Sequence, residues 1–483
     1  MKMFIGEKWV ESSDKTWMTV CNPGTGKEID RVPKATLQDM ETVVAAAQKG
    51  KLEMKKLTAL QRYELLIAVA QAIEAHSPEL GRLLAEENGK PIGQTRAEVA
   101  VTASIFRGFA EEAKRIFGRV MPVDAVRGNE RHFAMTIRQP LGVVAAIVPF
   151  NYPVELWGHK AASALAAGNA VISKPPSACP LTLLKIAQLM EGCGLPPNAH
   201  QMVTGPGAVI GDFLARSAGI QLVTVTGSTE VGIRIAQLAA ENLKKVHMEL
   251  GGNDALIILQ DCDLEKAVDA VVLGRLARGN GQICCAVKRI FVEAPIFDQY
   301  ADLLTKKAKA LKVGDQLEED TDVGPLITED AAKEVEAFIN GAIQAGAKLM
   351  TGGKRRNAFM EPTVLTDISV DMKMFKEEVF GPVAPLVRFT SIEEAIRLAN
   401  DSPYGLQSAV FTRDINKALE IAYKLEAGGV IINWSSALRV ETLPFGGIKM
   451  SGHGREGIHD TLDEMTDQKT IIVHNAFSTA SMG

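Results

Sequence analysis

Between residues 143 and 249 the chain alternates short apolar runs with longer amphipathic segments. Residues 143–148 are apolar at every position, which is typical of a strand buried on both faces of a parallel sheet. The next segment, residues 153–167, predicts a helix closed by Gly168. The same alternation predicts strands at 170–173, 201–203, 221–225 and 246–249, and helices at 180–191, 209–217 and 229–241. This order indicates an α/β fold whose open parallel sheet binds ligands at the carboxyl ends of its strands.

In two segments outside this region, the apolar positions recur with a different period. Residues 131–138 and 470–474 alternate polar and apolar positions. Such alternation predicts strands that expose one face. A plain surface hairpin would satisfy the pattern.

Length and composition narrow the class of protein. The chain has 483 residues, 46% of them hydrophobic and 23% charged, which predicts a soluble globular protein of two or three domains. A net charge of -5 without a basic patch argues against a nucleic-acid partner. No apolar run is long enough to cross a bilayer, so no membrane association is expected. The amino terminus lacks the apolar core of a signal peptide, and we expect a cytoplasmic location.

The cysteines and histidines do not suggest a metal centre. No Cys-x-x-Cys motif occurs, and the eight histidines lack metal-ligand spacing, so no metal site is predicted. Cys21, Cys179, Cys193 and Cys262 are scattered and are interpreted as small buried hydrophobic residues.

Glycine turns open two of the predicted helices. Gly207 and Gly211 belong to one turn, and Gly227 and Ser228 to the other. Backbone N–H groups at a helix amino terminus favour an anion such as a pyrophosphate. Neither turn has the strict G-x-G-x-x-G spacing, so each also fits a simple tight turn.

A lysine follows the strand predicted at 170–173, in the segment Lys174-Pro175-Pro176-Ser177. Fixed by two prolines, Lys174 can reach ribose hydroxyls or a phosphate. A solvated surface lysine is the alternative.

Two further segments carry reactive groups. Gly281-Gln282-Ile283-Cys284-Cys285 places a thiol in a short loop that glycine begins, and Glu249 precedes the pair Gly251-Gly252. A thiolate nucleophile and a nearby general base are the two groups that covalent acyl transfer requires.

Over nearly its whole length the chain resembles the aldehyde dehydrogenase superfamily. Seven segments occur in the order found in that family, which makes chance negligible. They are Pro149-Phe150-Asn151-Tyr152-Pro153, Lys174-Pro175-Pro176-Ser177, Thr226-Gly227-Ser228-Thr229-Glu230-Val231-Gly232, Glu249-Leu250-Gly251-Gly252, Gly281-Gln282-Ile283-Cys284, Glu377-Glu378-Val379-Phe380-Gly381-Pro382 and Pro444-Phe445-Gly446-Gly447.

The resemblance implies catalytic roles for three residues. Cys284 takes the position of the nucleophile and Glu249 that of the general base, while Cys285 is a non-catalytic neighbour. Asn151 takes the position whose side-chain amide holds the oxyanion; a turn residue before Pro153 is the alternative. Because relatives that transfer the acyl group to coenzyme A need no hydrolytic base, Glu249 favours a member that releases the free acid.

The resemblance also implies a nicotinamide cofactor. Lys174 and Glu378 resemble the ribose contacts, Ser228 resembles the pyrophosphate contact, and Phe380 would lie near the nicotinamide. A surface carboxylate is the alternative for Glu378. Members restricted to NAD often have an acidic residue where Ser177 stands, which repels a 2′-phosphate. Serine removes that repulsion, so NADP is favoured over NAD.

A domain division follows from the same resemblance. We expect a cofactor-binding domain from residues 1–122 and 141–250 and a catalytic domain from 251–448. Residues 123–140 and 466–483 would form a small β element that extends the sheet of a partner in a homodimer or homotetramer.

The substrate is predicted from two arginines in regions that line the substrate tunnel of relatives. Arg107 and Arg439 suit an anionic group, because a guanidinium donates two parallel hydrogen bonds. The candidates are lactaldehyde, glyceraldehyde-3-phosphate, succinic semialdehyde or a sulfo- or phosphono-aldehyde. The alternatives are ion pairs of Arg107 with Glu111 and of Arg439 with Glu441. Ile283 offers only apolar bulk where some phosphate-handling relatives have arginine.

A second hypothesis is a non-enzymatic nucleotide-binding or structural member with the same fold. The joint presence of Cys284, Glu249 and Asn151 argues against it, because a structural role needs none of them.

Overall fold

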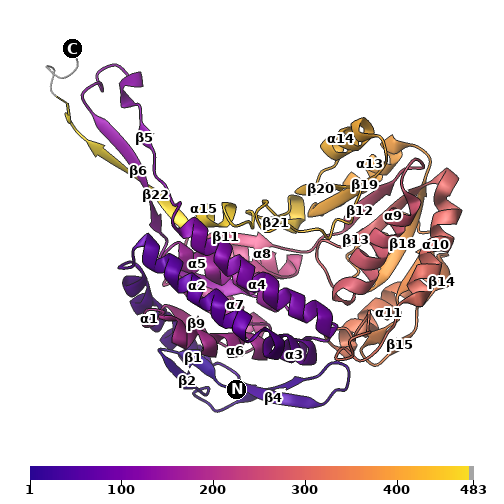
Figure 1. Cartoon of the computed structure of the whole chain (residues 1–483), viewed down its shortest axis with the longest axis horizontal. Coiled ribbons are helices and arrows are strands. Elements are labelled where there is room, and N and C mark those ends of the chain that lie inside the picture. The colour runs from indigo at the N-terminus through magenta and orange to yellow at the C-terminus, as the bar shows by residue number, and fades with distance from the viewer. Residues whose placement is uncertain (478–483) are drawn as a thin grey trace.

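The computed structural model describes residues 1–477 and contains two large sheets flanked by helices (Figure 1). The first sheet has the strand order β2-β1-β9-β8-β7-β10-β11-β21. Its central strands are parallel: β7 (Val143–Ile147), β8 (Ala170–Lys174), β9 (His200–Met202), β10 (Leu222–Thr226) and β11 (Lys245–Glu249). The edge strands are antiparallel: β1 (Met3–Ile5), β2 (Lys8–Val10) and β21 (Gly452–His453). The predicted parallel α/β sheet is therefore confirmed.

Helices cover both faces of this sheet, because successive side chains of a strand point to opposite faces. Val144 and Ala146 of β7 belong to one apolar cluster, and Val143 and Ala145 belong to another. The first face packs against α2 (Ala59–Ala75), α4 (Ile92–Ala113), α5 (Pro153–Ala166) and α6 (Leu181–Met190), with α3 (Ser77–Asn88) alongside. The second face packs against α1 (Leu37–Met54), α7 (Gly207–Arg216) and α8 (Thr229–Ala240). Every residue of α5 is buried.

The strand order places a topological switch in the middle of the sheet. The chain runs outward from β7 through β8 to β9, and then returns to the other side of β7 for β10 and β11. The loops after β7 and β10 therefore diverge and leave a crevice at the carboxyl ends of these strands, where such sheets bind their ligands. Asn151 follows β7 and Ser228 follows β10.

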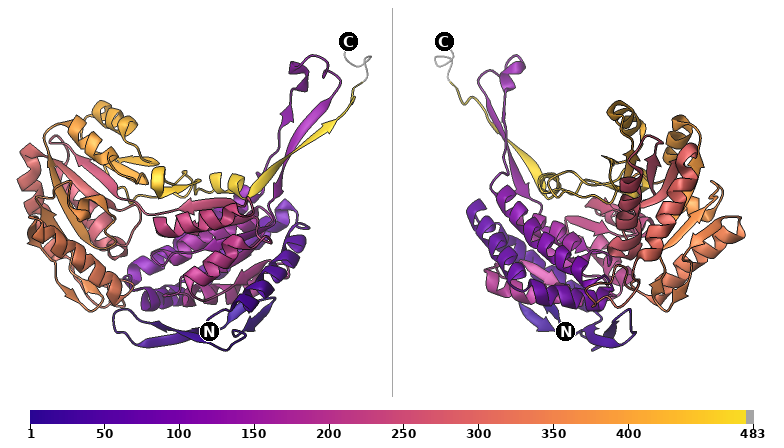
Figure 2. Two further views of the ribbon diagram at one scale, coloured as in Figure 1. Left: turned by 180° about the vertical axis from the view of Figure 1, so that it is seen from behind. Right: turned by 45° about the vertical axis from the view of Figure 1, so that its right-hand side comes forward.

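The second sheet has seven strands in the order β14-β17-β18-β13-β12-β19-β20. With its helices it forms the orange-coloured part of the molecule, to one side of the first sheet (Figure 2). They are β12 (Asp254–Ile258), β13 (Val287–Glu293), β14 (Lys348–Thr351), β17 (Thr363–Thr366), β18 (Val383–Phe389), β19 (Gln407–Phe411) and β20 (Gly429–Ile432). Its helices are α9 (Leu264–Val271), α10 (Phe297–Ala310), α11 (Glu329–Gln344), α12 (Lys373–Lys376), α13 (Ile392–Asn400) and α14 (Ile415–Lys424). All of these elements lie within the predicted range 251–448.

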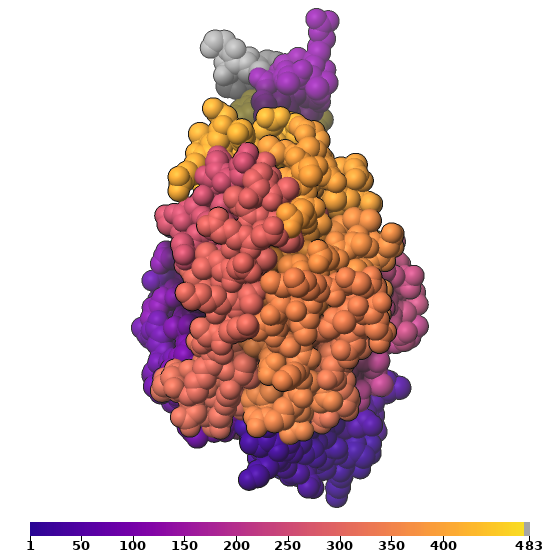
Figure 3. Space-filling view, turned by 90° about the vertical axis from the view of Figure 1, so that its right-hand side faces the viewer, coloured from indigo at the N-terminus to yellow at the C-terminus, as the bar shows by residue number. Residues whose placement is uncertain are grey.

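A narrow three-stranded sheet projects from the body (Figures 1 and 3). It consists of β5 (Val120–Met121), β6 (Phe133–Pro140) and β22 (Thr466–Val473), all antiparallel. The strands predicted at 131–138 and 470–474 are thus found as β6 and β22. Val120 and Ile472 expose most of their apolar side chains. Residues 478–483 of the predicted oligomerisation element lie outside the described residues.

Smaller elements complete the chain. They are the paired strands β3 (Trp17–Cys21) and β4 (Glu28–Pro33), the pair β15 (Arg355–Arg356) and β16 (Phe359–Met360), and helix α15 (Asp460–Glu464). Within residues 1–477 no helix combines the length and the apolar character needed to span a bilayer. In the same part of the chain, no group of three or more His, Cys, Asp or Glu side chains could hold a metal ion.

Candidate active site

A strained turn positions the predicted nucleophile between the two sheets. After α9 the chain passes through three consecutive left-handed residues, Gly279, Asn280 and Gly281, with φ of 58°, 55° and 73°. A Cβ on Gly281 would lie 2.4 Å from the carbonyl carbon of Gly381, so only glycine fits there. The Asn280 side chain holds the turn by donating to the carbonyl oxygens of Gly89 and Pro325, at 3.0 and 2.9 Å.

This turn delivers Cys284 to a pocket shared with the loop after β7. Cys284 is half-buried, whereas Cys285 is buried, so Cys284 is the more accessible thiol. The hydrogen bond with the neighbouring Cys285 thiol, followed by burial, raises the pKa of Cys284. The lining residues are Asn151, Tyr152, Glu155, Leu156, Arg278, Ile283, Cys284, Cys285, Ala437, Arg439 and Phe445. The structure therefore brings together Cys284, Asn151 and Arg439 from three distant segments.

Two guanidinium groups line the pocket, and their surroundings differ. Arg439 is buried and pairs with Glu441 and Glu456 at 3.2 and 3.1 Å, so its charge is balanced. Arg278, which sequence reasoning missed, donates to the Tyr152 hydroxyl and to the Ala437 carbonyl oxygen at 3.2 and 2.8 Å. Among residues 1–477, no carboxylate forms an ion pair with Arg278. Its cation is therefore available to an anion in the pocket.

Glu155 lines this pocket, and its carboxyl group ionises less readily than an exposed one. Burial, reinforced by the nearby Glu441 carboxylate, raises the pKa of Glu155 to about 7. A group with that pKa is partly protonated at pH 7. The negative charge of Glu155 beside Arg278 is therefore reduced at neutral pH.

The structure places Arg107 outside this pocket, unlike its predicted position. Arg107 lies on the exposed face of α4, where its guanidinium forms an ion pair with Glu74 of α2. This pair resembles the surface alternative, although the partner is Glu74 rather than Glu111. Arg107 faces α2 because the opposite face of α4 is apolar and packs in the core.

Glu249 lies in a buried chamber beside the pocket and does not line it. It ends β11, and a Cβ on Gly446 would lie 2.7 Å from its Oε1 atom. Neither carboxylate oxygen has a hydrogen-bond partner within the described part of the chain. Burial, followed by the Glu456 carboxylate, raises the pKa of Glu249 well above its usual range. A carboxyl with a raised pKa is a stronger base than an exposed one, as a general base requires.

A lysine missed by sequence reasoning ties Glu378 to the nucleophile loop. Lys288 forms an ion pair with Glu378 at 3.0 Å and donates a hydrogen bond to the Cys284 carbonyl oxygen. The Gly252 N–H donates to Glu378 at 3.4 Å. Lys288 lies inside an apolar strand, so no local pattern marks it. Glu378, Gly252 and Cys284 thus meet at one point between the sheets.

The predicted cofactor residues gather at the carboxyl end of β8. Lys174 is buried, and among residues 1–477 its ammonium makes one hydrogen bond, to Ser177 at 3.3 Å. Burial lowers the pKa of Lys174 to about 8. A Cβ on Gly207 would lie 3.8 Å from this ammonium, at the first residue of α7. A buried cation with spare donors beside a helix amino terminus fits ribose hydroxyls and phosphate.

The other predicted cofactor residues lie around the same crevice. Ser228 caps α8 by accepting a hydrogen bond from the Val231 N–H, and Gly227 precedes it. Gly211 lies within α7 rather than in a turn, and a Cβ there would make only ordinary contacts. Phe380 packs edge-on against Phe150, with ring centroids 5.8 Å apart, beside Asn151.

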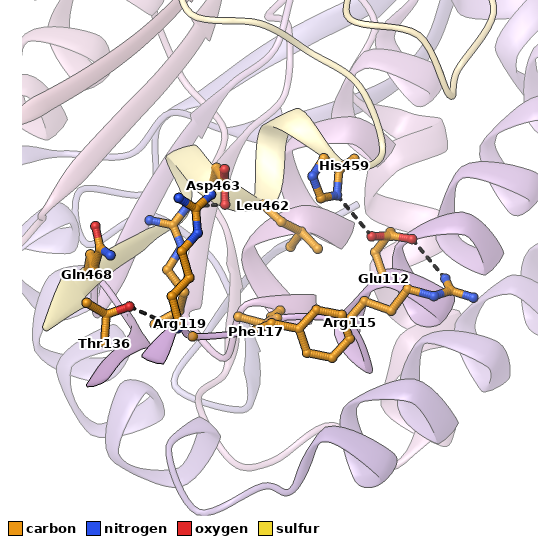
Figure 4. Close-up of a pocket in the computed structure, with 12 residues that line it drawn as sticks. Glu112, Arg115, Phe117, Arg119, Thr136, His459, Leu462, Asp463 and Gln468 are labelled. Atoms are coloured by element: carbon orange, nitrogen blue, oxygen red, sulfur yellow. Dashed lines mark hydrogen bonds and ion pairs between the residues drawn. The ribbon is translucent and has the colours of Figure 1, made fainter. Parts of the chain in front are cut away.

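A second hollow, of about 430 Å³, lies at the base of the projecting sheet (Figure 4). It differs from the pocket at Cys284 in its lining residues. Glu112 pairs there with Arg115 at 2.8 Å and with His459 at 3.3 Å, and Arg138 pairs with Asp463. These contacts satisfy most of its charges, and none of the predicted catalytic residues lines it.

Comparisons with known proteins agree with this architecture. A 3-sulfolactaldehyde dehydrogenase from Priestia aryabhattai is 40% identical over 98% of both chains. A lactaldehyde dehydrogenase from Methanocaldococcus jannaschii is 40% identical over 98% of this chain and 100% of its own. The crystal structure of a succinate-semialdehyde dehydrogenase from Burkholderia pseudomallei superposes with a TM-score of 0.95 at 37% identity, covering 98% of each chain.

The family model described as "Aldehyde dehydrogenase family" matches residues 9–471. With full-length relatives at 40% identity, this match makes the non-enzymatic alternative unnecessary. The chain belongs to the aldehyde dehydrogenase family and is an NAD(P)-dependent enzyme of that family.

Proposed function

We propose that the enzyme oxidises a small anionic aldehyde to its carboxylic acid, with Cys284 as the nucleophile. The thiol gives its proton to solvent water, Sγ bonds to the aldehyde carbon, and the carbonyl π pair moves to oxygen, which gives the oxyanion of a thiohemiacetal. The Asn151 amide and the Cys284 N–H would donate to the oxyanion. Donors aimed at such a charge each contribute about 3 to 4 kcal/mol. A nicotinamide bound in the crevice would supply the acceptor for the hydride that leaves this carbon, and a thioester would remain on Cys284.

Glu249 is assigned the second half of the reaction. It would take a proton from the water that attacks the thioester, which releases the acid and restores the thiol. The high pKa of Glu249 supports this role. Because its carboxylate lies beside the pocket rather than in it, the side chain must swing toward Cys284 to act.

The cofactor proposal favours NADP over NAD. Lys174, Ser177 and Gly207 would hold the adenosine ribose, with Glu378 on the other ribose. Ser228 would contact the pyrophosphate, and Phe380 would lie near the nicotinamide. Ser177 donates to the Gly205 carbonyl oxygen at 2.9 Å, and among residues 1–477 no carboxylate forms an ion pair with Lys174. A 2′-phosphate would therefore meet a cation without repulsion.

A glutamate at position 177 tests this preference. Ser177→Glu is expected to lower the NADP-to-NAD ratio of kcat/KM by about tenfold or more, because like charges would face each other. Ser177→Ala is the matched control, since it removes the hydroxyl without adding charge. Initial rates with both cofactors give the ratio. An unchanged ratio in Ser177→Glu would show that position 177 does not face the 2′-phosphate.

The proposal of an anionic substrate rests on Arg278, whose guanidinium forms no ion pair with a carboxylate of residues 1–477. It lines the same pocket as Cys284 and Asn151, with Arg439 on another wall. A carboxylate, sulfonate or phosphonate can accept two parallel hydrogen bonds from one guanidinium. The names of relatives that act on 3-sulfolactaldehyde and succinate semialdehyde support this reading, because both compounds are small anions. Arg107 is not part of the proposal.

Replacing Arg278 tests the substrate class. Arg278→Met should lower kcat/KM for succinic semialdehyde by about 10- to 150-fold, the cost of one charge-assisted contact. The effect should appear mainly in KM, since the contact persists from ground state to transition state. Activity toward butanal, a neutral aldehyde of equal length, should change little. Arg107→Met is the control, because it also removes an arginine but lies outside the pocket.

The ratio of the two kcat/KM values separates this effect from a folding defect, which would lower both. The anionic-substrate proposal fails if Arg278→Met leaves the ratio unchanged, or if Arg107→Met moves it equally.

The assembly and the domain division are proposals of the same kind. Residues 1–122 and 141–250 would form the cofactor domain, and 251–448 the catalytic domain. The projecting sheet of β5, β6 and β22 would extend the sheet of a partner subunit in a homodimer or homotetramer. The exposed apolar side chains of Val120 and Ile472 support an interface there.

A further inference from the structure

The chamber that holds Glu249 contains a second buried side chain with an unsatisfied polar atom. His247 and Glu249 are two residues apart on β11, so their side chains share one face of the sheet. His247 Nε2 lies 4.0 Å from Glu249 Oε1. Within residues 1–477, neither Nε2 nor either carboxylate oxygen has a hydrogen-bond partner. Three buried polar atoms without partners in one chamber call for an explanation.

The contacts on the other side of the ring determine which nitrogen carries the proton. Lys160 Nζ lies 3.2 Å from Thr224 Oγ1, and that oxygen lies 3.3 Å from His247 Nδ1. An ammonium can only donate, so Thr224 accepts from Lys160. Among residues 1–477 the Thr224 hydroxyl has no hydrogen-bond acceptor other than Nδ1, so its hydrogen is assigned to Nδ1. Nδ1 is then an acceptor, and the ring proton resides on Nε2. The N–H of His247 therefore faces the Glu249 carboxylate.

His247 is the group left to donate a hydrogen bond to Glu249, because two neighbouring cations pair with another carboxylate. Burial lowers the pKa of His247 to about 4, so the ring is neutral at physiological pH. Lys160 and Arg439 both pair with Glu456, at 2.7 and 3.1 Å. The other charged or titratable groups around the chamber are His159 of α5, His453 of β21 and Arg455.

Two glycines leave space for the side chains of His247 and Glu249. A Cβ on Gly454 would lie 2.1 Å from the His247 ring, and one on Gly446 would lie 2.7 Å from Glu249. The chamber therefore fits an imidazole and a carboxylate side by side. A short swing of Glu249 brings Oε1 within hydrogen-bond distance of Nε2, and catalytic hydrogen bonds that are long in the free enzyme often tighten in complexes.

We propose that His247 is a positioning residue, whose Nε2–H donates to Glu249 and holds the ionised carboxylate ready to swing toward Cys284. This inference rests on the proposed role of Glu249 as the base for hydrolysis. A donor to the charged form of a carboxyl favours that form. Loss of the donor should therefore make Glu249 harder to ionise and hydrolysis of the thioester slower near neutral pH.

Two substitutions distinguish this role from simple packing. Each keeps a hydrogen-bonding group near the position of one of the two ring nitrogens. His247→Asn keeps an acceptor for Thr224 but has no donor at the Nε2 position. His247→Gln places an amide N–H near the position of Nε2. The rising limb of kcat against pH should move upward by about one pH unit in His247→Asn, the effect of one hydrogen bond to a charged group. In His247→Gln the limb should stay close to that of the wild type.

The pre-steady-state burst of reduced cofactor completes the test, measured with the full-length enzyme. Its rate should be unchanged in His247→Asn, because acylation does not use Glu249, while steady-state turnover at pH 7 falls about tenfold. Equal loss in both phases, or an unmoved pH limb, would overturn the positioning role. The variant Glu249→Gln distinguishes failure of the inference about His247 from failure of the assignment of Glu249 as the base. If it stalls after the burst while His247→Asn behaves as wild type, only the inference about His247 fails. If Glu249→Gln turns over normally, the assignment of the base fails as well.

Discussion

Cys284→Ala is expected to abolish aldehyde oxidation, with kcat reduced by about 10⁴-fold or more, as for loss of other covalent nucleophiles. The strained turn at Gly281 brings this thiol into the pocket with Asn151, and no other accessible thiol lines it. The fold should survive, because Cys284 is only half-buried and alanine leaves the turn intact. Steady-state absorbance of the reduced cofactor with succinic semialdehyde measures the loss.

Cys285→Ala is the matched control for that variant. Cys285 is the adjacent thiol but is buried, so most of the activity should remain. Circular dichroism and thermal melting of both variants check that the fold is retained. Equal loss of activity in the two variants would mean that spacing and exposure do not identify the nucleophile.

Glu249→Gln should form one equivalent of reduced cofactor rapidly and then stop. Glutamine is nearly the same size but cannot accept the proton of water, so the thioester would accumulate. We expect steady-state turnover to fall by about 10²- to 10⁴-fold, the usual contribution of a general base. Stopped-flow absorbance resolves the burst from the slow phase.

The pH dependence gives an independent check on the same residue. Because burial raises the pKa of Glu249, hydrolysis in the wild type should increase with pH as this carboxyl ionises. In Glu249→Gln that limb should be absent from the slow phase. Unchanged turnover in the variant would remove Glu249 from the proposed mechanism.

The first sheet could be predicted from sequence because its strands are buried on both faces. The run at 143–148 became β7 (Val143–Ile147), and the predicted helix at 153–167 became α5 (Pro153–Ala166). The edge strand β21 could not be predicted in this way. It has only two residues, and it exists because the chain returns to pair with β11 from 200 residues away in sequence.

The reactive groups of the site were predictable from motifs, whereas their partners were not. Cys284 and Asn151 line one pocket, and their catalytic roles stay predictions. Arg278 and Lys288 gave no signal, because the residues next to a cation in sequence do not say which groups it will face in the folded chain. Arg107 was misplaced for the same reason, since the sequence of a helix does not say which neighbour its polar face meets.

The most direct test of the account is to locate the trapped acyl group. A Glu249→Gln, Cys285→Ala double variant, incubated with succinic semialdehyde and NADP, should hold one acyl group on Cys284 as a thioester. Peptide fragmentation by mass spectrometry should place the added mass on that residue, and only when both aldehyde and cofactor are present. An unmodified Cys284 after the burst, or an acyl group on another residue, would contradict the assignment of Cys284 as nucleophile and Glu249 as the base that releases its product.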